Sequence, residues 1–475
     1  MRLLRHSGTI DYPKPPGWHM DSRITLSQRS RLVDVANGAL PALWSTRLLE
    51  RPVLDADWIC ERVRQETGLA DFGGEWFRGA LDVLVRSLRE EASLSELGRF
   101  GAYGQLKKVL RDRLYAQQRC AQHPEIERRA LEKPVIVVGP MRSGTTRLHR
   151  LLAADTRFAH MRFFETICPV PAPHFRRGGK DLRWMTAATL HKAVRSFNPQ
   201  TSSIHPTGPF EPEEELGLLV RSIWGMKHEA QWRVPSYGRW SEEQDATPAY
   251  EHMARLLRLV GWARGDDDSR PWVLKTPQHM LDLPALLAVF PDARLIFTHR
   301  EPQAVVGSSC SLVWNQMIIH SNSVDPHEIG REWLRKTELQ ITRMRRARLQ
   351  IPESRRIDLR YEDMDRDWSA VMRQVYDFLD MDIEPALPAM ARYFGGAERE
   401  MHRHPHRYTL PAFGLDAGTV GERFRSYTDA FDLGEPAPQP SQPSGSFDLA
   451  ETATRRLVPV GEWQRTKAVS GAGSR

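Results

Sequence analysis

Two patterns of hydrophobic spacing divide the chain. Over roughly the first 130 residues, the segments 27–44, 55–68 and 76–94 place apolar residues three and four positions apart, which is typical of amphipathic helices. From Lys133 onward, short apolar runs at 134–139, 272–277, 294–300 and 355–363 each lead into a helical pattern. This alternation predicts a parallel sheet flanked by helices. Ligands of such sheets lie beyond the carboxyl ends of the strands.

These patterns predict three regions. Residues 1–131 form an all-helical N-terminal domain, and residues 132–432 form an α/β domain. Residues 433–475 begin with a Pro- and Ser-rich stretch and are expected to be a linker and a C-terminal tail.

The loop after the first apolar run carries a dense group of anion-binding residues. It reads GPMRSGTTRLH, from Gly139 to His149, between a predicted strand and a predicted helix. Backbone N–H groups and a helix N-terminus at such a loop suit a phosphate. The residues that add charge, hydroxyl groups or close backbone approach are Arg142, Ser143, Gly144, Thr145 and Thr146. Thr145 stands where a Walker A motif requires lysine, and a GxGxxG dinucleotide motif does not fit. The loop therefore predicts a P-loop-like phosphate site that is neither a Walker A motif nor a GxGxxG dinucleotide motif.

A second anion site is predicted at the end of the run 294–300. This run ends in His299 and Arg300, and Ser308 follows eight residues after Arg300, early in the next helical pattern. A kinase or ATPase would place an acidic Mg²⁺ ligand at the end of such a strand. Basic residues at this position indicate a nucleotide with phosphate at both ends, bound without a metal.

Composition limits the remaining classes. The 475 residues include 67 Lys+Arg and 60 Asp+Glu. The resulting formal net charge of +7 is too small for a chain of this length to indicate nucleic-acid binding. No window approaches the roughly 20 apolar residues of a membrane helix, and the N-terminus lacks the apolar core of a secretory signal. Four separated cysteines without metal-ligand spacing favour a reducing cytoplasm. We therefore expect a cytoplasmic protein without a transmembrane segment.

Taken together, the motifs resemble those of sulfotransferases that use 3′-phosphoadenosine 5′-phosphosulfate (PAPS). RSGTT after a strand resembles the 5′-phosphosulfate loop of that family, and Arg300 with Ser308 resembles its 3′-phosphate motif. YEDM at 361–364 is also typical. The resemblance covers roughly 133–432, and the helical N-terminal segment resembles an extension found in a bacterial branch. Many cytosolic members have lysine where this chain has Arg142, whose planar fork binds anions differently from a lysine ammonium.

The resemblance implies an enzyme that transfers a sulfuryl group from PAPS, as co-substrate, to a hydroxyl of a small-molecule, lipid or glycan acceptor, with no metal. Lys275 in LKTPQH resembles the lysine near the reacting centre of carbohydrate members. Glu165 is expected at the end of a second strand and resembles the catalytic glutamate of glycan sulfotransferases. His205 lies in a Pro- and Gly-containing loop, and histidine as a residue type suits a base near neutral pH. Glu165 and His205 both stand as candidates, singly or together, and His279 is a third.

Three further features receive weaker interpretations. Glu213, Glu214 and Glu215 follow Pro212 and are explained as acids at a helix start, so no chemistry is predicted for them by default. The alternative is that one of them orients His205. Arg407 and Tyr408 resemble a late segment that covers substrate or nucleotide. The N-terminal helices are expected to shape the acceptor entrance or to form a homodimer contact.

Two alternative functions remain. One is a P-loop nucleotide kinase or NTPase, which predicts Mg²⁺-dependent ATP binding and which the missing loop lysine disfavours. The other is a non-catalytic scaffold that binds nucleotide or a partner. The presence of Lys275, Glu165 and His205 beside both phosphate motifs disfavours that second reading.

Overall fold

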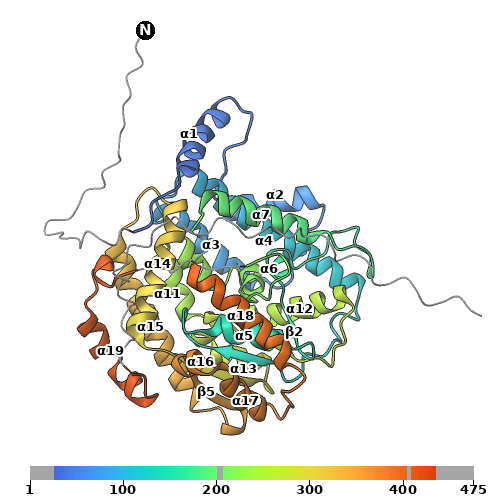
Figure 1. Cartoon of the computed structure of the whole chain (residues 1–475). Helices are drawn as coiled ribbons and strands as arrows, with labels where there is room; N and C mark the ends of the chain where they lie inside the picture. Colours follow the sequence, from blue (N-terminus) through green and yellow to red (C-terminus); the bar gives the residue numbers. More distant parts are fainter. Residues whose placement is uncertain (1–25, 201–206, 404–407, 435–475) are drawn as a thin grey trace, which may run out of the picture. The chain divides into compact units, whose positions relative to one another are not determined.

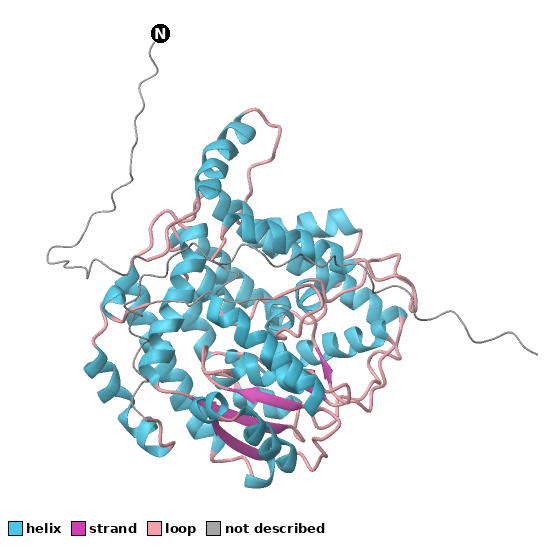
Figure 2. Ribbon diagram, in the orientation of Figure 1, coloured by secondary structure: helices cyan, strands magenta, loops and turns pink. Residues whose placement is uncertain are grey.

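The structure is a computed structural model that describes residues 26–200, 207–403 and 408–434, with side chains described up to 396 in the second range. His205 and Arg407 therefore lie outside the described residues, as does nearly all of the predicted tail. Figures 1 and 2 show strands grouped on one side and helices around them. Among the described residues, no helix has the length and apolar character needed to cross a bilayer.

Within the described residues, four helices occupy the N-terminal part, and the first three lie in the segments whose spacing predicts helices. They are α1 (Arg31–Ser45), α2 (Ala56–Thr67), α3 (Trp76–Glu90) and α4 (Glu96–Gln122). The Asp55 carboxylate caps the start of α2, and Gly68 ends that helix with φ 68°, a left-handed conformation that glycine adopts without strain.

The remaining part alternates strands with helices. In chain order the elements are β1 (Val135–Val138), α5 (Thr145–Ala153), β2 (Ala159–His160), α6 (Phe163–Ile167), α7 (Arg183–Phe197), α9 (Leu216–Leu219), η1 (Val220–Ser222), α10 (Lys227–Gln231), α11 (Pro235–Glu243), α12 (Thr247–Arg264), β3 (Trp272–Lys275), η2 (Pro277–Met280), α13 (Leu283–Val289), β4 (Arg294–His299), α14 (Pro302–His320), α15 (Pro326–Arg348), η3 (Glu353–Arg355), β5 (Arg356–Arg360), α16 (Tyr361–Arg366), α17 (Trp368–Phe378), α18 (Leu387–Arg403), η4 (Pro411–Phe413) and α19 (Ala417–Ala430).

The five strands of the described residues form one sheet in the order β2-β3-β1-β4-β5, and all neighbouring strands are parallel. The predicted parallel α/β architecture is therefore confirmed. β1 lies at the centre, between β3 and β4. The segments that follow these three strands therefore meet at one edge of the sheet, although they are far apart in sequence.

Alternation along the strands separates two cores. Ile136 and Val138 of β1 pack in a cluster with α12, α13, α14 and α15, whereas Val135 and Val137 pack in a cluster with α5 and α17. Successive side chains of a strand point to opposite faces, so four consecutive apolar residues bury both faces of the central strand. Helices on both faces fix the position of the loop that follows β1.

The N-terminal helices share a core with the later chain. Buried residues of α2, α3 and α4 cluster with a segment between residues 220 and 237 that includes Ile223 and Trp232. The predicted boundary between residues 131 and 132 falls in the loop before β1 and stays a prediction.

Candidate active site

The loop after β1 has the backbone of an anion-binding turn. Gly144 has φ 80° and precedes α5, and no side chain caps the first N–H groups of that helix. Arg142 also has a positive φ, 69°, which costs energy in a residue with a Cβ atom. The Ser143 hydroxyl donates to the Pro140 carbonyl oxygen at 2.8 Å and lies 2.9 Å from the Thr298 hydroxyl. The Ser143 side chain thus links the loop to β4. The N-terminus of α5 is the kind of position at which proteins bind anions.

The two predicted anion motifs form one cluster. Arg142 Nε donates to the Ser308 hydroxyl at 2.9 Å, although 166 residues separate them. Arg300 Nη1 donates to the carbonyl oxygen of Arg142 at 2.5 Å. Burial, and next the charge of Arg300, lower the pKa of Arg142. Two cations beside one hydroxyl make a site that an anionic group would stabilise.

Two tyrosines line this cluster. The Arg300 guanidinium lies 3.9 Å from the centre of the Tyr361 ring, a cation–π contact. The same ring covers Gly144, where a Cβ atom would lie only 2.6 Å from Tyr361 Cδ2. Tyr408 donates from its hydroxyl to the Ala304 carbonyl oxygen at 3.1 Å. Tyr408, predicted as a covering residue, therefore lies along the start of α14.

Lys275 joins the phosphate loop to the segment that precedes α9. Its ammonium donates to the Thr146 hydroxyl at 3.1 Å and forms an ion pair with Glu214. The Lys275 side chain is 1% exposed and that of Glu214 is 19% exposed. A buried cation is therefore held beside the start of α5, and the carboxylate that neutralises it keeps some contact with solvent.

A chain of buried hydrogen bonds supports Lys275 from behind. The Lys275 backbone N–H donates to Glu215 at 2.8 Å, and the other Glu215 oxygen lies 2.7 Å from His279 Nε2. His279 Nδ1 lies 2.9 Å from the Tyr250 hydroxyl. Burial raises the pKa of Glu215, but the hydrogen bond and charge of His279 outweigh it and lower the pKa overall. Both nitrogens of His279 are engaged in this support.

Glu165 lies in a different setting from the one predicted. It is part of α6 and follows the end of β2 by five residues, so the expected strand end is wrong. Its carboxylate accepts from the backbone N–H of Arg162 at 2.8 Å and from Arg264 Nε at 2.6 Å. A second nitrogen of Arg264 donates to the other Glu165 oxygen and to the His160 carbonyl. The fully buried Glu165 thus links β2, α6 and the end of α12.

Sequence reasoning missed the contacts that Glu214 and Glu215 make with Lys275. Acids after a proline fit a helix start, and Glu215 is indeed the residue that precedes α9. Neither carboxylate caps that helix, however, because both bind Lys275, one at its ammonium and one at its backbone N–H. Only the pairing of distant segments reveals this role.

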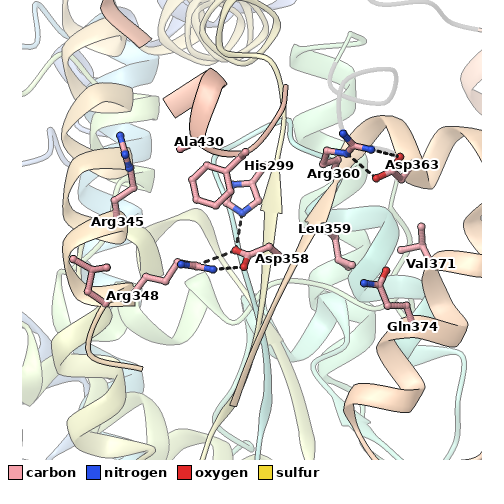
Figure 3. A pocket seen from close by; sticks show the side chains of 12 residues that line it. His299, Arg345, Arg348, Asp358, Leu359, Arg360, Asp363, Val371, Gln374 and Ala430 are labelled. Carbon is pink, nitrogen blue, oxygen red and sulfur yellow. Dashed lines mark hydrogen bonds and ion pairs between the residues drawn. The ribbon is translucent and has the colours of Figure 1, made fainter. Parts of the chain in front are cut away.

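A large hollow lies beside the site, on the edge strand β5 (Figure 3). It has a volume of about 590 Å³, and its charged groups other than Arg345 pair with one another. Arg348 pairs with Asp358, and Arg360 pairs with Asp363. His299 is held between Asp358 and Tyr427, at 3.0 Å from each, so of the basic pair that ends β4 only Arg300 reaches the phosphate loop.

One acidic cluster has the spacing of metal ligands. It consists of Glu229, Glu242 and Glu332. The Lys336 ammonium already lies 2.6 Å from Glu229 and also pairs with Glu242. Arg335 Nη2 bonds to both Glu242 and Glu332, at 2.6 Å each. The protein's own cations therefore neutralise this cluster.

The fold and the site together define the class: a parallel α/β protein with a Gly- and Ser/Thr-rich loop after its central strand, and with Arg142, Arg300 and Ser308 clustered at that loop. The chain belongs to the sulfotransferase family, whose family profile matches residues 134–385. It is similar to the omega-hydroxy-beta-dihydromenaquinone-9 sulfotransferase Stf3 of Mycobacterium bovis and of Mycobacterium tuberculosis, with 25% identity over 276 residues. The match covers 55% of this chain and 66% of that relative, just under two thirds of its length.

Two solved structures resemble the fold over most of the chain. Sulfotransferase STF1 from Mycobacterium tuberculosis H37Rv is 29% identical, with a TM-score of 0.69, and covers 79% of this chain and 100% of its own. Sulfotransferase STF9 from Mycobacterium avium is 25% identical, with a TM-score of 0.71, and covers 80% and 98%. These similarities confirm the predicted sulfotransferase fold with its helical N-terminal region.

Proposed function

We propose that this chain transfers a sulfuryl group from PAPS to the hydroxyl of a lipid-like acceptor. The observation that carries the proposal is the contact between Arg142 and Ser308, with Arg300 against the same loop. This cluster lies beside the uncapped N-terminus of α5, so one nucleotide with two phosphate groups fits both sites. The family match supports the sulfuryl donor.

The contacts favour a particular division of the nucleotide between residues. Because the Arg142 side chain points to Ser308, we assign it with Arg300 and Ser308 to the 3′-phosphate. The 5′-phosphosulfate is assigned to the backbone N–H groups of residues 144–146, the Thr145 and Thr146 hydroxyls, and Lys275. This revises the sequence-based prediction that Arg142 holds the 5′ group. Tyr361 and Tyr408 would flank the nucleotide.

Glu214 is our proposed base. In the transfer, the acceptor oxygen bonds to sulfur while the bond between sulfur and the bridging phosphate oxygen breaks, and the leaving phosphate keeps the electron pair. A base must accept the hydroxyl proton, and a cation must stabilise the leaving phosphate. Lys275 and Glu214 hold such a pair at the phosphate loop. Lys275 would move from Glu214 to the nucleotide, which leaves the carboxylate to accept the proton.

The earlier candidates for the base keep the status of predictions. Glu165 is engaged on both oxygens by Arg264, which favours a structural role for it. His205 lies outside the described residues. Three substitutions distinguish these candidates: Glu214→Gln, Glu165→Gln and His205→Ala. Turnover and nucleotide affinity are measured separately for each variant.

The acceptor class rests on the relative. Stf3 is named for a hydroxylated menaquinone derivative, which is a lipid. We propose a hydroxylated lipid for this chain in place of a small polar metabolite or a glycan. The cytoplasmic location, the homodimer contact and the absence of a metal stay predictions.

Calorimetric titration with 3′-phosphoadenosine 5′-phosphate (PAP) and with AMP tests the nucleotide assignment. Arg300→Ala should weaken PAP binding by about 10- to 100-fold, since hydrogen bonds to charged groups contribute about 1.5–3 kcal/mol, and should leave AMP affinity almost unchanged. Arg86→Ala on α3 is the matched control. Equal affinity of the native protein for PAP and AMP would contradict the proposal. Mg²⁺-dependent ATP binding would favour a kinase instead.

A further inference from the structure

Exposed apolar side chains gather on two neighbouring helices. Thirteen large hydrophobic residues of the described chain are exposed, and ten of them lie on α1, on α7 or beside them. The ten are Leu32, Val35, Leu43, Leu48, Leu182, Trp184, Met185, Leu190, Val194 and Phe210. Scattered exposed hydrophobic residues are ordinary, but a gathered set marks an interaction surface. We call it the α1–α7 surface.

Both helices are poorly covered by the protein. Each has 15 residues, of which two are buried: Val33 and Leu40 in α1, and Arg183 and Ala187 in α7. On α1, the exposed residues Leu32, Val35 and Leu43 repeat at helical spacing and share one face. A helix of this kind lacks the packing that usually stabilises it, so a partner is expected on the exposed face.

The two exposed faces are continuous. Leu190, Val194 and Phe197 follow one another at i, i+4 and i+7 and form one stripe of α7. Phe197 packs with Val33 of α1 and with Ile318 of α14, whereas Leu190 and Val194 are 45% and 40% exposed. The stripe that joins α7 to α1 therefore continues into solvent. Figure 1 shows the two helices at the same end of the described chain.

The segment that contains α7 is strongly basic, both in the helix and in the residues before it. Residues 174–200 contain six basic residues and one acidic residue, Asp181, which pairs with Arg183. The other five have no ion-pair partner among the described residues; they are Arg176, Arg177, Lys180, Lys192 and Arg195. Lys192 and Arg195 line a hollow of about 480 Å³ on the face of α7 opposite the stripe. An anionic surface would complement these charges.

We propose that the α1–α7 surface binds the anionic surface of a lipid bilayer, in which the acceptor is dissolved. Helices that lie in the bilayer interface combine Trp, Leu and Phe on one side with Lys and Arg on the other. The buried core of an interface between proteins, in contrast, is depleted in charged residues. The proposal rests on the lipid acceptor assigned above. It adds that the enzyme reaches this acceptor from the membrane surface.

Sedimentation of the full chain with vesicles tests the proposal without nucleotide or acceptor. The chain should bind vesicles rich in phosphatidylglycerol and should bind phosphatidylcholine vesicles weakly, with a loss of binding as salt rises. Lys192→Gln with Arg195→Gln should weaken binding about 25-fold, since each basic residue near an anionic bilayer contributes about fivefold. Leu190→Ser with Val194→Ser should weaken it at least tenfold.

Matched controls lie away from the surface. Arg86→Gln with Arg89→Gln on α3 repeats the charge change, and Leu349→Ser after α15 repeats the apolar change at a residue that is 75% exposed. Both controls should bind vesicles like the native chain, and circular dichroism should show every variant folded. Equal binding by native chain and variants would overturn the proposal, as would a native chain that ignores anionic vesicles.

The two proposals fail in different ways. A chain that binds PAP but no vesicles refutes only the membrane surface, and a chain that binds vesicles but not PAP refutes only the nucleotide site. Analytical ultracentrifugation tests the alternative that a second copy of the chain binds the α1–α7 surface. A native dimer that Leu190→Ser with Val194→Ser converts to a monomer, without vesicle binding, would overturn the proposal in favour of a dimer contact.

Discussion

Replacement of Glu214 by glutamine should strengthen PAP binding while it lowers turnover. Glu214 neutralises Lys275, whose ammonium also binds Thr146 at the phosphate loop. Two anions bound by one ammonium lie about 5 Å apart, and at an effective dielectric constant near 20 two unit charges at that distance repel by about 3 kcal/mol. Glu214 is 19% exposed, and solvent screening reduces this to about 1–2 kcal/mol. PAP should therefore bind roughly 5- to 30-fold more tightly to Glu214→Gln.

Turnover should move in the opposite direction. A general base contributes about 10²- to 10⁴-fold to the rate, so the maximal rate of Glu214→Gln should fall by a factor in that range. The assay combines calorimetric titration with PAP and measurement of sulfated product at saturating PAPS. Glu165→Gln is the matched control, because its carboxylate pairs with Arg264. It should lower the free energy of unfolding by about 3 kcal/mol, as expected for a broken buried pair, without tighter PAP binding.

Weaker or unchanged PAP binding by Glu214→Gln would refute the reasoning, because it would separate Glu214 from the nucleotide phosphate. Tighter PAP binding with a normal maximal rate would support the contact between Lys275 and the nucleotide phosphate but would exclude Glu214 as the base. A large loss of turnover in Glu165→Gln, with its stability intact, would restore Glu165 as the better candidate.

Three further substitutions test the surroundings of the site. Gly144→Ala places a Cβ atom 2.6 Å from the Tyr361 ring, and its positive φ alone costs about 1–2 kcal/mol, so calorimetry should show PAP affinity reduced at least tenfold. Burial lowers the pKa of His228 to about 3, below an unfolded value near 6.5. The unfolded chain therefore gains a proton that the native chain does not, and stability falls by about 1.4 kcal/mol per pH unit below pH 6.5. Thermal unfolding at pH 7.5 and 5.5 should show this loss, and His228→Leu should reduce it. Asn315 is 1% exposed, and neither amide atom has a hydrogen-bond partner in the part of the chain that the structure describes, so Asn315→Leu should raise the free energy of unfolding by about 1–3 kcal/mol in urea titrations; a decrease would contradict this.

Short-range patterns explain which parts of the fold and site were predictable. Four of the five strands lie within predicted apolar runs, because buried parallel strands are continuous apolar segments. The fifth, β2, has two residues and gives no such signal. The phosphate loop and the pair of Arg300 and Ser308 lie within single stretches of chain, so their spacing alone indicates an anion site.

The rest depends on contacts between distant segments. The loop alone assigns Arg142 to the 5′ group, whereas the proposed 3′ assignment depends on its hydrogen bond to Ser308 of α14, 166 residues away. Glu214 and Glu215 matched a helix-start pattern, and only β3 reveals what they bind. Glu165 matched a catalytic position, and its partner Arg264 lies 99 residues away at the end of α12. A local pattern identifies the residue type at a site but not its partner.

The proximity of Arg142 and Arg300 has a kinetic consequence. The charge of Arg300 contributes to the lowered pKa of Arg142. The two positive charges therefore repel each other until an anion binds between them. On the proposed assignment, both donor and spent nucleotide carry the 3′-phosphate that relieves this repulsion. The spent nucleotide would therefore leave slowly, and its departure would limit the catalytic cycle once acceptor is abundant. Accumulated PAP would then inhibit the enzyme.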